Sequence, residues 1–309
     1  MTGEISRNRL YKTERRDKMG SVNAAVSARS AGEGKTAARA RTRGGRMNEG
    51  EFRLIRDYDS RLLEKEQVSA DVWHLTFECP EIAAAARPGN FVLVKTAAGS
   101  APLLRRPLGI LGADPAKGTV EMLFRVVGQG TALLSRAAPG ATFSVRGPVG
   151  GQFGPFGHEK IWAVAGTLGV APLLFLRREL NGFGHLFLGV GNASWRSFAE
   201  WVRSRAPEMV LYSDDGSIGR KGFSIAGLEG QDLSGVSLVC CGPNPMMKAL
   251  YERYGSQCDD IQVSLERRMG CGMGGCFGCV VDTATGRRRV CIDGPVFQAR
   301  EVKWDELHL

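Results

Sequence analysis

The sequence lacks any long hydrophobic run. No apolar stretch approaches the roughly 20 residues needed to cross a bilayer, and the start of the chain has no apolar segment typical of a signal peptide. These absences predict a cytoplasmic protein without membrane association. A content of 43% hydrophobic and 24% charged residues is typical of globular proteins, and 309 residues suffice for two ordinary domains and a small module.

Histidine is scarce, and no catalytic constellation is visible. The four histidines, at positions 74, 158, 185 and 308, are scattered along the chain. We find no paired carboxylates and no arrangement of serine, histidine and aspartate, the groups that acid–base or nucleophilic chemistry requires. Chemistry on an organic substrate is therefore expected on a separate chain.

The net charge of +9 lies almost entirely in one segment. Residues 1–46 hold twelve Lys and Arg but four acids, so they carry +8 and leave about +1 for the rest of the chain. Because this segment is rich in Ala, Gly, Ser and Arg, a disordered basic leader is expected. A nonspecific polyanion-binding tail and a transit peptide are the alternatives. The body of the protein is not basic, so no specific nucleic-acid binding is expected.

Short strands separated by turns begin at residue 51. Alternating or apolar segments occur at 72–77, 90–95, 106–111, 119–127 and 141–147, with Pro-Gly, Asp-Pro and Gly-Pro pairs between them. Strands at this spacing without long helices predict a small antiparallel barrel over residues 51–153.

Strands and helices alternate in the next segment. Strands are predicted at 161–165, 185–190, 209–212 and 237–241, and helices at 171–180, 197–205 and 245–254. The alternation predicts an α/β domain with a parallel sheet over residues 156–256. Residues 257–309 are rich in Gly and Cys and too short for a core of their own, so a small C-terminal module ordered by a cofactor is expected. The predicted fold class is therefore an α+β multidomain chain.

Four of the eight cysteines are spaced for an iron–sulfur cluster. Cys271, Cys276, Cys279 and Cys291 form a C-x4-C-x2-C-x11-C pattern, and the first three match the plant-type spacing for a 2Fe–2S cluster. Five glycines in the loop 270–279 permit positive φ and let backbone N–H groups approach the sulfurs. Zinc is the weaker alternative, because the last cysteine stands alone without a histidine nearby. Three others are expected to be ordinary buried thiols: Cys79, Cys240 and Cys258.

Two segments of the barrel region could cradle a pyrophosphate. Arg106 lies on a predicted strand in the run Arg-Arg-Pro-Leu-Gly, and the strand at 123–127 runs into a Gly-rich helix start at Gly130 and Thr131. A cation beside helix N–H groups neutralises phosphate charge. A strand with a solvated arginine pair is the alternative.

Two strand–turn–helix segments follow in the α/β region. The strand at 161–165 leads into the turn 166–169 and a helix, and residues 241–246 repeat this order. Such a helix N-terminus is where the phosphates of a dinucleotide can lie. A plain turn is the alternative, because the full G-x-G-x-x-G pattern is absent.

These motifs occur in the order found in a known superfamily. Arg-Pro-Leu-Gly, Gly-x-Gly-Thr, Ala-Gly-x-x-Gly-Val-Ala-Pro, Asp-Asp-Gly-Ser-x-Gly and Cys-Gly-Pro-x-Pro-Met precede the Cys-rich segment. Over residues 51–305 the chain resembles the ferredoxin–NADP reductase superfamily, and within it most closely the electron-transfer subunits of class 1B dihydroorotate dehydrogenases. The most specific stretch extends from 264–269 to 291–297.

The resemblance implies the cofactors and the residues that bind them. FAD and a 2Fe–2S cluster would be bound, NAD(P) would be the co-substrate, and the four cysteines would ligate the cluster. The implied FAD-binding residues are Arg106, Pro107, Leu108, Gly109, Leu123, Phe124, Arg125, Gly130 and Thr131. The implied residues of the NAD(P) site are Gly166, Gly169, Cys241, Gly242 and Pro243. Ser194 and Arg196 leave NADP(H) open, because they could receive a 2′-phosphate.

The resemblance also implies an oxidoreductase subunit that hands electrons to another protein. Its partner would be an FMN-containing catalytic subunit of the dihydroorotate dehydrogenase type in a hetero-oligomer of pyrimidine biosynthesis. A subunit of an NADPH:ferredoxin oxidoreductase or of a sulfhydrogenase-type complex is the related alternative, and a redox-sensing iron–sulfur regulator is another. Met269, Met273 and Phe277 lie beside the cluster cysteines and are expected either to meet the partner or to pack inward.

Overall fold

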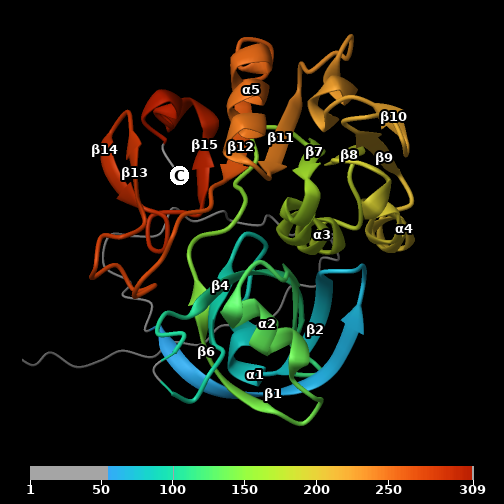
Figure 1. Ribbon diagram of the computed structural model, residues 1–309. Helices are drawn as coiled ribbons and strands as arrows, with labels where there is room; N and C mark the ends of the chain where they lie inside the picture. The colour runs from blue at the N-terminus through green and yellow to red at the C-terminus, as the bar shows by residue number, and fades with distance from the viewer. Residues whose placement is uncertain (1–54, 100, 308–309) are drawn as a thin grey trace, which may run out of the picture. The chain divides into compact units, whose positions relative to one another are not determined.

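The computed structural model describes residues 55–99 and 101–307, and the predicted leader at 1–46 lies outside these ranges. Within them, six strands close into an antiparallel barrel in the order β1-β2-β5-β4-β3-β6 (Figure 1). The barrel strands are β1 (Arg56–Gln67), β2 (Val72–Glu78), β3 (Phe91–Lys95), β4 (Arg106–Asp114), β5 (Thr119–Arg125) and β6 (Thr142–Val149). Two short helices accompany them, α1 (Pro80–Ala85) and α2 (Gln129–Arg136). The predicted barrel and its five predicted strands are confirmed.

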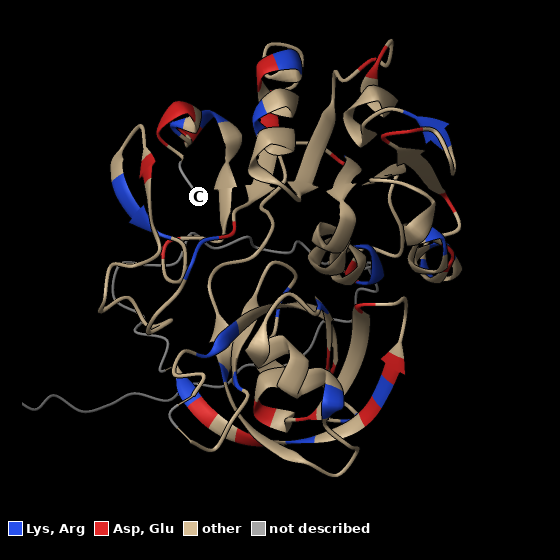
Figure 2. Ribbon diagram, in the orientation of Figure 1, with Lys and Arg blue, Asp and Glu red and all other residues tan. Residues whose placement is uncertain are grey.

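Strand β1 is an element that the residue pattern did not predict. Only Ser60 and Leu62 of its twelve residues are buried. Figure 2 shows charges of both signs along it. The strand is held by pairing with β2 on one side and β6 on the other, so barrel closure rather than its own sequence pattern gives it its conformation.

The second half of the chain forms a mainly parallel sheet. Within the described residues its order is β10-β9-β8-β7-β11-β12-β15, and only the last strand runs antiparallel to its neighbour. Its strands are β7 (Lys160–Gly166), β8 (His185–Val190), β9 (Met209–Ser213), β10 (Arg220–Lys221), β11 (Val236–Cys241), β12 (Asp260–Ser264) and β15 (Val296–Gln298). The predicted parallel sheet is confirmed.

Helices cover both faces of this sheet. The helices are α3 (Val170–Glu179), α4 (Arg196–Arg205) and α5 (Asn244–Tyr254). Ala163 and Ala165 of β7 share a buried cluster with residues of α3 and α4, whereas Trp162 and Val164 share one with residues of α5. Successive residues of β7 therefore meet different helices, as in sheets buried on both sides.

The C-terminal segment divides between the sheet and a hairpin. All five residues of β12 are buried, and β12 pairs with both β11 and β15, so the sheet continues beyond residue 256. Strands β13 (Val280–Thr283) and β14 (Gly286–Arg289) form a separate antiparallel hairpin, and Figure 2 shows the arginines of β14. The assignment of residues 257–309 to a module of their own remains a prediction.

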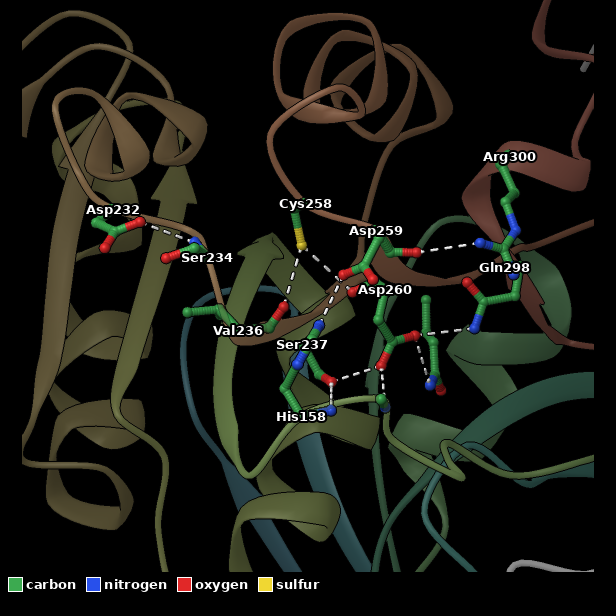
Figure 3. A network of polar contacts seen from close by, with 12 residues as sticks. His158, Asp232, Ser234, Val236, Ser237, Cys258, Asp259, Asp260, Gln298 and Arg300 are labelled. Atoms are coloured by element: carbon green, nitrogen blue, oxygen red, sulfur yellow. Dashed lines mark hydrogen bonds and ion pairs between the residues drawn. The ribbon is translucent and has the colours of Figure 1, made fainter.

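A buried carboxylate fastens the linker between barrel and sheet. Asp260 accepts hydrogen bonds from the Gly157 N–H at 2.7 Å, from the Ser237 hydroxyl at 2.5 Å and from Gln298 Nε2 at 2.9 Å (Figure 3). Burial opposes ionisation of this carboxyl, but these donors outweigh it and lower its pKa. Cys258 is buried nearby and donates its thiol hydrogen to the Val236 carbonyl oxygen, as expected for an unreactive thiol.

Candidate cofactor-binding site

A cavity of about 600 Å³ lies where three segments of the chain meet. Its walls come from barrel strands β4 and β5, from the turn after β7 and the end of β11, and from residues 264–269, which lead into the cysteine loop. Small-molecule sites typically measure roughly 300–1,000 Å³, so the volume suits an organic cofactor. The strand order also changes direction between β7 and β11, where open α/β sheets bind their ligands.

Most of the predicted flavin-binding residues line this cavity. The lining includes Arg106, Pro107, Leu108, Gly109, Leu123, Phe124, Arg125 and Thr131. The structure therefore brings together residues that lie on two strands and a helix. Gly109 faces Pro172 of α3, and a Cβ atom on it would lie 3.8 Å from Pro172 Cδ. The barrel wall and the sheet wall of the cavity thus meet at this pair.

The guanidinium of Arg106 lies directly over Gly130, at the start of α2. A Cβ atom on Gly130 would come within 2.2 Å of Arg106 Nε, so the absence of a side chain makes room for the cation. No carboxylate in the part of the chain that the structure describes forms an ion pair with Arg106, which donates to the Leu104 carbonyl oxygen at 2.5 Å. The first N–H groups of α2 have no helical partner, so cation and amides together suit a pyrophosphate.

The hydroxyl of Thr131 is used within its own turn. It accepts hydrogen bonds from the Val127 N–H at 3.0 Å and the Gly128 N–H at 3.2 Å, and it donates to the Gly128 carbonyl oxygen. Thr131 can therefore offer a phosphate its backbone N–H, while its hydroxyl fixes the turn that starts α2.

Arg105 and Arg125 are engaged differently from Arg106. Arg105 also borders the cavity, but it donates to the Asp57 carboxylate at 2.6 Å and to the Ser144 carbonyl oxygen at 2.7 Å. Arg125 donates to the Asp71 carboxylate at 2.5 Å. Of these three cations, Arg106 is thus the one without a carboxylate partner among the described residues.

The predicted glycines of the nucleotide site pack two turns against each other. A Cβ atom on Gly169 would lie 2.2 Å from the Cys241 carbonyl oxygen, and one on Gly166 would lie 2.6 Å from Pro243 Cδ. Gly242 has a φ of +156° and lies against Gly166. These glycines let the ends of β7 and β11 approach closely, and of the five predicted residues only Cys241 lines the cavity.

Glu266 is a residue of the cavity wall that sequence reasoning missed. It follows β12, and although solvent reaches it, the surrounding walls desolvate its carboxyl and raise its pKa. Burial, followed by the charge of Glu266, also raises the pKa of the Cys241 thiol. The two titratable groups therefore lie close together at the ends of neighbouring strands. The stretch 264–269 belongs to the resemblance, but no spacing in the sequence gave Glu266 a role, because only the sheet order brings it to this edge.

The four predicted cluster cysteines form two pairs. Cys279 Sγ lies 3.3 Å from Cys291 Sγ, and both residues are buried. The Cys271 N–H points at Cys276 Sγ at 3.5 Å, and Cys276 is exposed. No group of three or more His, Cys, Asp or Glu side chains in residues 55–99 and 101–307 converges on one metal position. Two pairs of thiols suit a cluster of two iron atoms.

Backbone N–H groups lie close to the sulfurs of Cys271 and Cys276, as the glycines of the loop led us to expect. Gly272 and Gly274 adopt positive φ, and the Met273 N–H approaches Cys271 Sγ at 3.4 Å. Burial opposes ionisation of Cys271, but the N–H groups of its loop and the Cys276 thiol lower its pKa to about 7. Burial and the Cys279 thiol raise the pKa of Cys291 to about 12, so metal ligation would be needed to hold it as a thiolate. The donor set fits an iron–sulfur cluster.

Comparisons with known families agree with these two sites. The family model for the oxidoreductase FAD-binding domain matches residues 59–153. The model for the iron–sulfur cluster binding domain of dihydroorotate dehydrogenase B matches residues 266–303. The barrel is therefore an FAD-binding domain, and the cysteine segment is an iron–sulfur binding domain.

A solved structure supports the fold over most of the chain. The structure of an NADH-dependent reduced ferredoxin-NADP oxidoreductase aligns with a TM-score of 0.69 and 28% identity, covering 80% of this chain and 91% of that one. A ferredoxin reductase of carbazole 1,9a-dioxygenase aligns with a TM-score of 0.57 at 19% identity, which shows the fold alone. The chain thus has the ferredoxin reductase fold, whose sheet binds NAD(P).

The chain aligns with sequence relatives over most of their length. The dihydroorotate dehydrogenase B (NAD(+)) electron transfer subunit of Desulforamulus reducens is 35% identical over 80% of this chain and 98% of its own. That of Geobacillus thermodenitrificans is 37% identical over 78% and 96%, and that of Bacillus caldolyticus is 40% identical over 70% and 86%. With the flavin cavity, the paired cysteines and this coverage in agreement, the chain belongs to the family of dihydroorotate dehydrogenase B electron transfer subunits.

Proposed function

We propose that this chain carries electrons between NAD(H) and a separate catalytic subunit that oxidises dihydroorotate to orotate in pyrimidine biosynthesis. The observation that carries the proposal is the cavity whose walls come from the flavin-binding barrel, the nucleotide-binding sheet and the segment leading to the cluster cysteines. FAD, when bound, exchanges electron pairs with a nicotinamide and single electrons with an iron–sulfur cluster. The chain's own residues bind and orient these groups.

Each wall of the cavity has a distinct task in this proposal. Arg106 and the first N–H groups of α2 hold the flavin pyrophosphate. The close packing of Gly166 and Gly169 against the end of β11 shapes the side on which a nicotinamide enters. Cys241 and Glu266 border that side, where an ionisable carboxyl can accept a hydrogen bond from a carboxamide. The paired cysteines hold the cluster beyond residues 264–269.

NAD(H) is the proposed coenzyme, because the names of the relatives specify NAD(+). Ser194 and Arg196 are exposed, and the Ser194 N–H is engaged by Asn192 Oδ1 at 2.9 Å. Comparing kcat/KM for NADH and NADPH in dye reduction tests the choice, and a preference for NADPH would refute NAD(H) as the coenzyme.

The partner is proposed to be an FMN-containing catalytic subunit that docks at the cysteine loop, in a cytoplasmic hetero-oligomer. Phe277 and Met273 are 64% and 46% exposed, whereas Met269 is buried in the core. Two apolar side chains therefore flank the exposed Cys276 in solvent, the kind of centre that protein interfaces bury. Phe277 also has a φ of +56°, so a strained backbone presents it. Within residues 55–99 and 101–307, none of the helices could span a lipid bilayer.

Replacing Phe277 with aspartate tests the docking surface. Aspartate tolerates positive φ better than most residues, so the loop conformation should survive. The variant chain alone should reduce a small dye with NADH at the wild-type rate, because a dye can take electrons from the flavin. With the catalytic subunit added, dihydroorotate-dependent NAD reduction should fall at least 10-fold. Leu180→Asp is the matched control, an exposed apolar residue at the end of α3.

Three results would contradict parts of the proposal. Full dihydroorotate-linked activity in Phe277→Asp would place the docking surface elsewhere. Loss of iron from that variant would show that Phe277 packs around the cluster. If the wild-type chain and its partner never couple dihydroorotate to NAD, the function itself is refuted.

The alternative is reduction or oxidation of ferredoxin. The solved structure with a TM-score of 0.69 is that of a ferredoxin-NADP oxidoreductase, at 28% identity. The sequence relatives cover more of their own length at higher identity and favour dihydroorotate. A ferredoxin-dependent rate above the dihydroorotate-dependent rate would favour the ferredoxin alternative over dihydroorotate oxidation.

A further inference from the structure

The cysteine loop rests on one cross-strand row of the barrel. The strand register pairs Asp57 of β1 with Arg146 of β6, Arg146 with Leu93 of β3, and Leu93 with Pro107 of β4. The row therefore begins at β1 and ends in the strand that lines the flavin cavity. The residues on either side of Leu93 belong to the barrel core, so Leu93 lies on the outer face, yet it is fully buried. Something outside the barrel covers it.

That cover is the beginning of the cysteine loop. A Cβ atom on Gly272 would lie 2.5 Å from Leu93 Cδ1, so the loop backbone lies directly on this side chain. Gly272 has a φ of +67°, which glycine adopts at no steric cost. The loop can therefore approach the barrel only because position 272 has no side chain.

Arg146 binds the same loop with a directed hydrogen bond. Its Nη1 donates to the Cys271 carbonyl oxygen at 2.8 Å. Its Nε and Nη2 donate to the two carboxylate oxygens of Asp57 at 2.6 Å and 3.0 Å. The side chain is only 19% exposed. A guanidinium held by a carboxylate fork has a fixed plane, so its remaining N–H points in one direction.

Charge also favours this arrangement. The hydrogen bond from Arg146 and, to a smaller extent, the charge of Arg105 lower the pKa of the Asp57 carboxyl and outweigh the effect of its partial burial. Asp57 therefore stays ionised near neutral pH and holds two guanidinium groups. Arg105 uses its other N–H groups on β6, at the Ser144 carbonyl and hydroxyl oxygens, and Arg146 alone of the two donates to the loop.

We propose that Arg146, held by Asp57, is a positioning residue that fixes the cysteine loop against the flavin-binding barrel. Its bond to Cys271 and the contact of Gly272 with Leu93 set the loop on a row that continues to Pro107 in the cavity wall. The inference deepens the proposed function, because transfer between flavin and cluster requires their supports to keep a fixed separation. The loop contact itself does not depend on that function.

The test uses the full-length chain, purified with flavin and iron bound. Arg146→Gln is compared with Arg61→Gln, a control on the neighbouring strand β1 whose guanidinium pairs with Glu78 in solvent. Amide hydrogen exchange over residues 270–279 reports the order of the loop. Stopped-flow absorbance after mixing with NADH follows flavin and cluster reduction separately, and the EPR signal after dithionite reduction reports intact cluster.

A charge-assisted hydrogen bond typically contributes enough to change an equilibrium by roughly 10-fold to 100-fold. Exchange of the loop amides should therefore accelerate by about that factor in Arg146→Gln and stay unchanged in Arg61→Gln. Cluster reduction should slow at least 10-fold, while flavin reduction by NADH and the dithionite-reduced EPR intensity stay at the control level. Unchanged loop exchange, or slowing of flavin reduction by the same factor, would overturn the assignment.

Gly272→Ala provides a second variant in case Arg146→Gln loses its iron. Its methyl group would overlap Leu93 Cδ1, and alanine is strained at a φ of +67°, so the loop should leave Leu93 while Arg146 and Asp57 remain, and we expect the same faster exchange. Wild-type exchange in Gly272→Ala would overturn the row as the support of the loop. A chain that reduces its cluster with NADH but never couples to dihydroorotate would refute the proposed function and leave the loop result standing.

Discussion

Replacing Arg106 with alanine removes a guanidinium that lies over the first turn of α2 and pairs with no carboxylate in the described part of the chain. A charge-assisted hydrogen bond contributes roughly 1.5–3 kcal/mol. At about 1.4 kcal/mol per decade, FAD should be retained about 10-fold to 100-fold more weakly. The measurement is flavin fluorescence released on dilution of the purified chain, which gives Kd directly.

Arg105→Ala is the matched control for this prediction. Arg105 also borders the cavity, but its guanidinium is bound to Asp57 and Ser144, and Asp57 keeps its bonds to Arg146 when Arg105 is replaced. We therefore expect some loss of stability but little change in the Kd for FAD. Equal losses for the two variants, or a larger loss for Arg105→Ala, would refute the assignment of Arg106 to the pyrophosphate.

Gly130→Ala tests the same site without removing charge. Its methyl group would lie 2.2 Å from Arg106 Nε, so the flexible guanidinium must move away from the helix N-terminus. We expect weaker FAD binding, smaller in effect than that of Arg106→Ala. Wild-type affinity would show that the position of the cation over α2 does not matter.

Two further predictions concern the cluster and the pH dependence of stability. Cys276→Ser should deplete iron and acid-labile sulfide, whereas Cys79→Ser, a buried thiol of the barrel core, should leave both unchanged; equal iron content in the two variants would contradict the ligand assignment. The hydrogen bond from His74, followed by that from Arg178, lowers the pKa of Glu121 from 4.5 to about 2 against the effect of burial. Glu121→Gln should therefore lower the free energy of unfolding at pH 7, measured by urea titration, by roughly 3 kcal/mol. Because the folded-state pKa lies below the unfolded one, this stability is present above about pH 4.5 and is lost as the pH falls toward 2. A variant whose stability has the same pH dependence as that of the wild type would contradict the assignment.

Elements with local signals could be predicted from the sequence. The strand–turn–helix segments after β7 and β11 and the cysteine spacing place their residues within a few positions of one another, so pattern and function coincide. The alternation of strands and helices likewise predicted the parallel sheet. Cys79, Cys240 and Cys258 are buried as expected.

Elements fixed by distant partners could not be predicted. Strand β1 is mostly polar, and its pairing with β2 and β6 forms only when the barrel closes. Arg146 lies 89 residues from Asp57 and 125 residues from Cys271, so no local pattern shows that the three meet. Strand β12 was not predicted. It has only five residues, and its pairing with neighbouring strands is what identifies it.

Helix α3 connects the barrel to the sheet beside the cavity. Its first turn meets the barrel where Pro172 faces Gly109, and Phe175 joins the barrel core. Its last turn is fastened by Arg178, which donates to Glu121 of β5 at 2.9 Å. Helix α3 is therefore attached to the barrel at both ends, and the cavity lies at its first turn. Loosening the far end should thus weaken FAD retention together with stability in Glu121→Gln, and unchanged retention in that variant would show that the contact at Pro172 holds the cavity by itself.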